Sequence, residues 1–138
     1  MLIAVDFDGT IVQDRYPAIG KELPFATKTL KMLMEEGHRF ILWTVRSGRT
    51  LEEAVEWCRE RGIEFYAVNQ NFVGEDENNK EHHYSRKLKV EMFIDDRGVG
   101  GLPDWGTIYR IIHEDKTYEE ILLEHAEEGS KRKSWWPF

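Results

Sequence analysis

Short apolar runs alternate along the chain with longer stretches in which apolar residues recur every three or four positions. The short runs, rich in β-branched and aromatic residues, predict strands, and the longer stretches predict amphipathic helices. The predicted strands cover residues 2–5, 39–44, 63–68, 90–94 and 107–112. The predicted helices cover residues 24–36, 50–61 and 117–128. This alternation predicts a doubly wound, Rossmann-like α/β fold with a mainly parallel sheet of about five strands.

Three helix boundaries carry recognisable signals. Gly37 follows the first predicted helix and suits the left-handed conformation that ends many helices. Thr50 and Thr117 begin the other two helices, and a glutamate (Glu53 or Glu120) follows each threonine three residues later. This spacing predicts a capping box, in which the two side chains bond to backbone N–H groups of the first turn.

Length and composition fit one globular domain. The chain has 138 residues, of which 41% are hydrophobic and 33% charged, enough to build a single core. We expect this domain to span residues 1–128, with a basic and aromatic tail over 129–138. No apolar run approaches the roughly 18 to 20 residues that cross a bilayer, and the N-terminus lacks the features of a signal peptide. We therefore expect a cytoplasmic protein without a membrane partner.

Charge and cysteine content exclude further classes. The formal net charge of −7 argues against general nucleic-acid binding through a broad basic face. Cys58 is the single cysteine, and it shares one face of its predicted helix with Leu51, Ala54 and Val55. We interpret it as a buried core thiol and not as a nucleophile.

Polar residues follow three of the predicted strands at the point where each strand ends. Asp6 and Asp8 follow the first strand, Thr44 ends the second, and Asp95 and Asp96 end the fourth. In open α/β sheets the site lies beyond the carboxyl ends of the strands. Two acidic clusters there would repel each other unless a cation joined them, and oxygen ligands suit Mg²⁺. The sequence therefore predicts a magnesium site.

These segments resemble the motifs of the haloacid dehalogenase-like hydrolases. Asp6-Phe7-Asp8-Gly9-Thr10, after an apolar strand, resembles the first motif of that superfamily, hhhhDxDGT. Phe40-Ile41-Leu42-Trp43-Thr44 resembles the second motif, and Met92-Phe93-Ile94-Asp95-Asp96 resembles the acidic fourth motif. The third motif of the superfamily is a lysine, for which Lys87 and Lys89 are candidates. The resemblance runs from Leu2 to about Arg97, in the order and spacing of the family.

The resemblance implies a small Mg²⁺-dependent phosphatase that hydrolyses phosphomonoesters. Asp6 would attack the phosphorus and become an aspartyl phosphate. Asp8 would protonate the leaving oxygen and later activate water, and Thr44 would hydrogen-bond a phosphoryl oxygen. The implied metal ligands are Asp6, the backbone carbonyl of Asp8, Asp95, and Asp96 either directly or through water.

The charge of the expected site explains why a lysine is needed. Asp6, Asp95 and a phosphate dianion would repel one another strongly in a partly desolvated cleft, even with Mg²⁺ bound. We favour Lys87 over Lys89 for this role, because Lys87 comes directly out of a polar loop that can reach the strand ends. We interpret Arg97 as a residue that orients the acidic pair and does not meet the substrate.

Further substrate contacts are expected at the same strand ends. Gly9 permits the tight turn after the first strand, and together with Thr10 it belongs to the predicted substrate-binding set. Arg46 and Ser47 follow Thr44 and either bind the anionic part of the substrate or form a solvated turn.

The chain leaves no room for a cap domain. Residues 11–24 suffice for a hairpin-like flap, and residues 46–87 already hold a helix, a strand and a polar loop. The open site suits a small phosphorylated substrate enclosed by the loop or by a partner subunit of a homo-oligomer. It also permits a bulky substrate, such as a nucleic-acid end.

Several functions stay open. The first is phosphomonoester hydrolysis, with a nucleotide or nucleic-acid-end phosphatase as its variant. The second is a phospho-accepting regulatory domain, in which Asp6 takes phosphate as a signal. Asp8 argues against this second function, because it supplies an acid–base group that a slow acceptor does not need. The third is an inactive scaffold of the same fold.

Overall fold

The computed structural model describes residues 1–79, 81 and 83–134, with the backbone alone at 131–134. Its contacts divide the chain into two compact units, Met1–Leu102 and Pro103–Phe138. The predicted domain over 1–128 and the predicted tail over 129–138 stay predictions. Residues 135–138 of that tail lie outside the described part of the chain. Within that part, no helix combines the length and apolar character needed to span a membrane.

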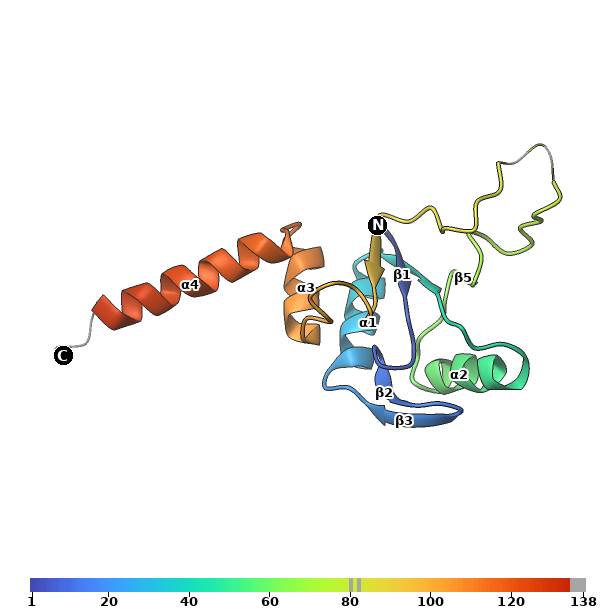
Figure 1. Cartoon of the computed structure of the whole chain (residues 1–138), viewed down its shortest axis with the longest axis horizontal. Helices are drawn as coiled ribbons and strands as arrows, with labels where there is room; N and C mark the ends of the chain where they lie inside the picture. The colour runs from blue at the N-terminus through green and yellow to red at the C-terminus, as the bar shows by residue number, and fades with distance from the viewer. Residues whose placement is uncertain (80, 82, 135–138) are drawn as a thin grey trace. The chain divides into compact units, whose positions relative to one another are not determined.

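The first unit contains a parallel sheet of four strands in the order β5-β4-β1-β6. The strands are β1 (Leu2–Val5), β4 (Arg39–Leu42), β5 (Ala67–Val68) and β6 (Met92–Ile94). With the helices of Figure 1, this is a mixed α/β fold that is compatible with a Rossmann-like domain without a cap. The fold class predicted from the sequence is confirmed, although this sheet has four strands and not five.

The core lies against the two central strands. Both are buried, and Ile3 of β1 pairs with Phe40 of β4. Helix α1 (Ala26–Glu35) buries Leu30 and Leu33, and helix α2 (Gly48–Glu60) buries Ala54 and Cys58. Burial raises the pKa of the Cys58 thiol to about 12, because a thiolate loses its hydration there. The interpretation of Cys58 as a core thiol is confirmed.

A two-stranded antiparallel hairpin follows β1 and lies beyond the carboxyl end of that strand (Figure 1). Its strands are β2 (Val12–Arg15) and β3 (Ala18–Glu22), which confirms the predicted flap over residues 11–24. The strands approach closely at Gly20, where a Cβ atom would overlap the backbone carbonyl of Gln13. Glycine is therefore required for this pairing.

The second unit contains α3 (Trp105–His113) and α4 (Tyr118–Ser134). The strand predicted over 107–112 is therefore wrong. Asp104 caps α3, since its side chain accepts hydrogen bonds from the backbone N–H of Thr107 at 3.1 Å and from its hydroxyl at 2.6 Å. The buried Trp105, Ile108 and Ile112 recur at helical spacing. The β-branched residues suited either structure, and the cap selects the helix.

The helix-end predictions had mixed outcomes. The Thr117–Glu120 capping box is present, with reciprocal hydrogen bonds of 2.9 and 3.2 Å, but α4 continues past the predicted end at residue 128. Gly37 ends α1 with a φ of 95°, as predicted. The predicted cap at Thr50 is wrong, because α2 already begins at Gly48 and the Thr50 hydroxyl donates back to the Ser47 carbonyl at 2.9 Å.

Three strands are shorter than predicted. The strand expected over 39–44 ends at Leu42, so Thr44 follows the strand and does not end it. The strand expected over 63–68 shrinks to Ala67–Val68, since the N–H groups of Arg61, Gly62 and Ile63 bond to carbonyls in the last turn of α2. The strand expected over 90–94 is confined to Met92–Ile94. Of these three changes, only that in β4 moves the carboxyl end of a strand that carries a candidate site residue, and it does so by two residues.

Candidate functional site

Three carboxylates converge at the carboxyl ends of β1 and β6. Asp6 follows β1, while Asp95 and Asp96 follow β6, and the two strands pair directly, with Val5 opposite Ile94. The pairing continues past the strand end, because the N–H of Asp6 donates to the carbonyl of Ile94 at 3.0 Å. One carboxylate oxygen from each of the three aspartates lies within 4.8 Å of the other two. We call these residues the acidic trio.

The environment of Asp6 favours a bound cation. Burial raises the pKa of Asp6 to about 7, and the charges of Asp95 and Asp96 act in the same direction, against a hydrogen bond from the Phe7 N–H at 2.8 Å. Three converging carboxylates provide the hard oxygen donors that Mg²⁺ prefers. The acidic trio therefore fits a divalent metal by donor chemistry and by spacing.

Gly9 and Thr10 shape the position of Asp96. The buried Thr10 hydroxyl donates to Asp96 Oδ1 at 3.2 Å and accepts a bond from the Asp96 N–H at 3.2 Å. Gly9 has a φ of 80°, and a Cβ atom there would overlap the Asp96 carboxylate, with 2.8 Å to its Cγ. Both residues were predicted to bind substrate. The structure places both next to Asp96, and neither borders the pocket described below, so their contact with substrate stays a prediction.

Asp8 lies outside the acidic trio and pairs with Arg46. The guanidinium donates from Nε to Asp8 Oδ2 and from Nη2 to Asp8 Oδ1, each at 2.7 Å. Its other N–H groups donate to the carbonyls of Pro17 and Thr50 at 3.2 Å and of Ala18 at 2.9 Å. The hydrogen bonds with Asp8 raise the pKa of Arg46, so the guanidinium stays charged.

This pairing corrects the interpretation of Arg46. Arg46 is 1% exposed, and protein oxygens accept from every N–H group of its guanidinium. The sequence suggested either a substrate contact or a solvated turn, and the structure shows neither. Arg46 instead joins the turn after β1 to the flap and to the first turn of α2. Ser47 is exposed and does not line the pocket described below.

Thr44 presents its hydroxyl at the end of β4. This hydroxyl accepts a hydrogen bond from the Arg46 N–H at 3.1 Å, so its own proton can be donated to an oxygen in the pocket. Asn69, at the end of β5, holds the Thr44 backbone, since its side-chain oxygen accepts from the Thr44 N–H at 2.8 Å. The sequence analysis missed Asn69. Its place directly after a strand was the signal that could have found it.

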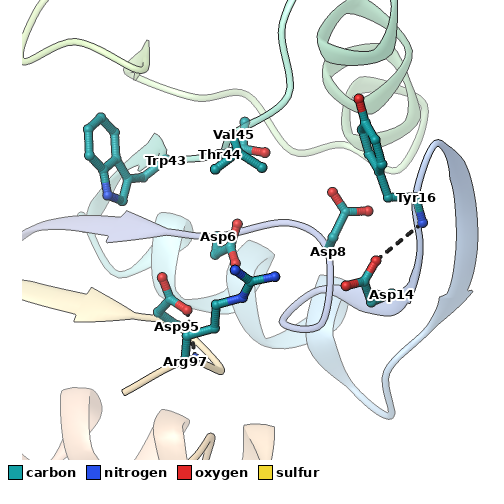
Figure 2. A pocket seen from close by; sticks show the side chains of 9 residues that line it. All are labelled: Asp6, Asp8, Asp14, Tyr16, Trp43, Thr44, Val45, Asp95 and Arg97. Carbon is teal, nitrogen blue, oxygen red and sulfur yellow. Dashed lines mark hydrogen bonds between the residues drawn. The ribbon is translucent and has the colours of Figure 1, made fainter. Parts of the chain in front are cut away.

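A pocket of about 400 Å³ opens over these strand ends (Figure 2). It is bordered by four carboxylates, two aromatic rings and three other side chains. These residues are Asp6, Asp8, Asp14, Tyr16, Trp43, Thr44, Val45, Asp95 and Arg97. The flap contributes Asp14 and Tyr16, which have no part in the family motifs and were not predicted.

Neither candidate lysine lines the pocket. Lys87 Nζ lies 5.7 Å from the centre of the Phe93 ring, and Lys89 Nζ donates to the His83 carbonyl at 3.5 Å. Both lysines precede β6, whereas Asp95 follows it. A residue before a strand lies toward the amino end of that strand, away from the carboxyl end where the site forms. The placement therefore does not support the predicted role of Lys87.

Comparison with solved structures gives a strong likeness. No family model matches the sequence, and no curated protein matches it. The solved structure of a conserved protein from Bacteroides thetaiotaomicron matches with a TM-score of 0.79 and 59% sequence identity. The match covers 88% of this chain and 96% of that one. The chain therefore belongs to the same protein family as this conserved protein from Bacteroides thetaiotaomicron.

Proposed function

We propose that the protein is a Mg²⁺-dependent phosphomonoester hydrolase of the haloacid dehalogenase-like type, with Asp6 as its nucleophile. The observation that carries the proposal is the acidic trio, which brings three carboxylates together where β1 and β6 end. Asp8 and Thr44 border the same pocket. These residues match, position by position, the motifs that the sequence resembles.

The acidic trio would hold the metal. When bound, Mg²⁺ would neutralise part of the charge of the carboxylates and of the phosphoryl group. The Asp8 side chain is not a ligand in this proposal, because it lies outside the acidic trio and pairs with Arg46. The backbone carbonyl of Asp8 stays a predicted ligand.

Asp6 would form and then lose a bond to phosphorus. A carboxylate oxygen attacks the phosphorus in line, the bond to the ester oxygen breaks, and an aspartyl phosphate results. Water then attacks the phosphorus, which releases inorganic phosphate and restores Asp6. The hydrogen bond from the Phe7 N–H holds one carboxylate oxygen of Asp6 in place during both steps. The Thr44 hydroxyl donates to a phosphoryl oxygen.

Asp8 would move the proton. It gives a proton to the leaving oxygen in the first step and takes one from water in the second. Each oxygen of Asp8 accepts one hydrogen bond from Arg46 and keeps a second lone pair that can carry the proton. Arg46 thus fixes the direction of the Asp8 carboxyl group.

The charge of the pocket favours a small substrate with one phosphate. Asp6, Asp8, Asp14 and Asp95 border the pocket, and only Asp8 is paired with a buried cation. A nucleic-acid end would bring further phosphates toward these carboxylates, which would repel them. A small phosphomonoester with an uncharged leaving group avoids this repulsion.

The test is hydrolysis of an aryl phosphate by the wild-type protein and by Asp6→Asn. We expect turnover with Mg²⁺, loss of turnover with excess chelator, and loss in Asp6→Asn. Asp14→Asn serves as the matched control, because it removes a pocket carboxylate outside the acidic trio. Circular dichroism verifies that both variants fold.

Two outcomes would contradict the proposal. Activity retained by Asp6→Asn would exclude Asp6 as the nucleophile. Stable phosphorylation of Asp6 by a small phosphodonor, without release of phosphate over hours, would instead support a phospho-accepting regulatory domain.

A further inference from the structure

We infer that Arg97 is the cation that binds the phosphoryl group of the substrate, in the role that a lysine has in the motif pattern. The inference rests on the proposed function, because it concerns the charge balance of the same pocket. It departs from the sequence analysis, which assigned this role to Lys87 and gave Arg97 the task of orienting the acidic pair.

Arg97 lies where it can meet a phosphoryl group bound at Asp6. Arg97 borders the pocket together with Asp6 and Asp95. Its backbone is fixed next to the acidic trio, since its N–H donates to Asp95 Oδ1 at 2.8 Å. Figure 2 shows the Arg97 side chain extending from the end of β6 toward Asp6. A phosphoryl group in contact with Asp6 would therefore lie within reach of the guanidinium.

No acidic side chain in the described part of the chain engages the Arg97 guanidinium. Within the described part of the chain, no Asp or Glu forms an ion pair with it at 4.0 Å or less. Arg46 shows the contrast, because protein oxygens accept from its whole guanidinium. An arginine guanidinium is planar and carries five N–H donors, so it can donate two parallel hydrogen bonds to two oxygens of a phosphate.

The described residues offer the pocket no cation besides Arg97. Among the described residues that border the pocket, Arg97 is the only one with a positive charge. Lys87 lies over the Phe93 ring and Lys89 bonds to a backbone carbonyl, both ahead of β6. A phosphate dianion that approaches Asp6 and Asp95 needs positive charge beyond that of the metal. Arg97 is the side chain placed to supply it.

The experiment compares Arg97→Gln and Arg97→Lys with Lys87→Gln and Lys89→Gln. In the presence of Mg²⁺, we would measure kcat and KM for an aryl phosphate, and the affinity for inorganic phosphate by calorimetry. We expect Arg97→Gln to lower kcat/KM and to weaken phosphate binding, each by about tenfold or more, since a charge-assisted hydrogen-bond pair is lost. Arg97→Lys should restore part of both, and the two lysine variants should stay within about twofold of wild type.

The two measurements separate this inference from the proposed function. If Arg97→Gln matches wild type in both measurements while Lys87→Gln loses activity, the inference is wrong and the hydrolase stands. If no protein turns over but wild type binds phosphate and Arg97→Gln does not, Arg97 keeps its role and the hydrolase proposal fails. If wild type neither turns over nor binds phosphate, both are overturned.

Discussion

Asp8 and Arg46 form a buried, two-point ion pair that connects the turn after β1 to the loop after β4. The two hydrogen bonds are 2.7 Å long, and the side chains of Arg46 and Asp8 are 0% and 11% exposed. The remaining N–H groups of Arg46 donate to backbone carbonyls of the flap and of α2. It is thus a structural element and at the same time the support of the proposed acid–base group.

Removal of Arg46 should destabilise the protein strongly. Arg46→Ala leaves the Asp8 carboxylate and three carbonyl groups without their donor, and breaking a buried pair in this way costs about 3–5 kcal/mol. Urea unfolding would measure this loss. Asp8→Asn combined with Arg46→Ala forms the double-mutant cycle, which should show strong coupling. Additive effects would contradict the pairing.

Arg46→Lys tests whether Arg46 positions Asp8, because it keeps the positive charge but removes the planar guanidinium that donates to both Asp8 oxygens. If Arg46 positions Asp8, this variant should lower kcat more than it raises KM, and it should shift the pH dependence of kcat. A variant that loses stability but keeps the kinetic pH profile of wild type would show that Arg46 acts on the fold alone.

Gly9→Ala should weaken metal binding. The new methyl group would overlap the Asp96 carboxylate and push it away from the acidic trio. Gly74→Ala is the matched control, because Gly74 has a similar φ of 85° but open space around its Cβ position. Strain at positive φ costs about 1–3 kcal/mol at either position. Calorimetric titration with Mg²⁺ should show a loss of affinity in Gly9→Ala alone, and equal losses would refute the steric argument.

The stability of the metal-free protein should fall as pH rises from about 4 to about 7. Burial raises the pKa of Asp6 from its ordinary value of 3.8 to about 7, so between these values the folded state binds a proton that the unfolded state has released. This proton stabilises the fold at low pH, and the contribution disappears as pH passes through the folded pKa. Asp6→Asn should lack this part of the slope in urea titrations at a series of pH values. An unchanged slope in that variant would exclude Asp6 as its source.

Cys58 should resist alkylation in the folded protein. Its side chain is buried, and burial raises its pKa to about 12, so very little thiolate forms near pH 8. Iodoacetamide at pH 8 should label Cys58 slowly in buffer and rapidly in denaturing urea, as followed by intact mass. Equal rates in the two conditions would show that the thiol is accessible in the native state.

The acidic trio was the most predictable part of the site. Asp6 and Asp95 follow apolar runs, and the carboxyl ends of parallel strands meet at one edge of the sheet, so their approach follows from topology. The position of Lys87 was not predictable in this way. The strand predicted over 90–94 already put Lys87 ahead of β6, but sequence spacing does not show how far the preceding polar loop reaches, and Lys87 Nζ lies over the Phe93 ring.

Arg46 and α3 show two other limits. The burial of Arg46 depends on carbonyl groups of Pro17, Ala18 and Thr50, which come together only after the flap folds over the loop. The segment of α3 has a composition that suits a strand, and the decisive signal was the single side chain of Asp104. Local patterns thus predicted which residues gather at the strand ends better than they predicted which residues support them.

The anchoring of the flap has a consequence for turnover. The connection between β2 and β3 is bonded to a buried guanidinium through the carbonyls of Pro17 and Ala18, so swinging the flap outward would expose a charge and break two hydrogen bonds. We therefore expect the flap to stay in place during turnover. In many hydrolases a lid sets the pace of the reaction; here substrate would enter and phosphate would leave by diffusion, and the slow event would be the chemistry itself or the release of phosphate from Arg97.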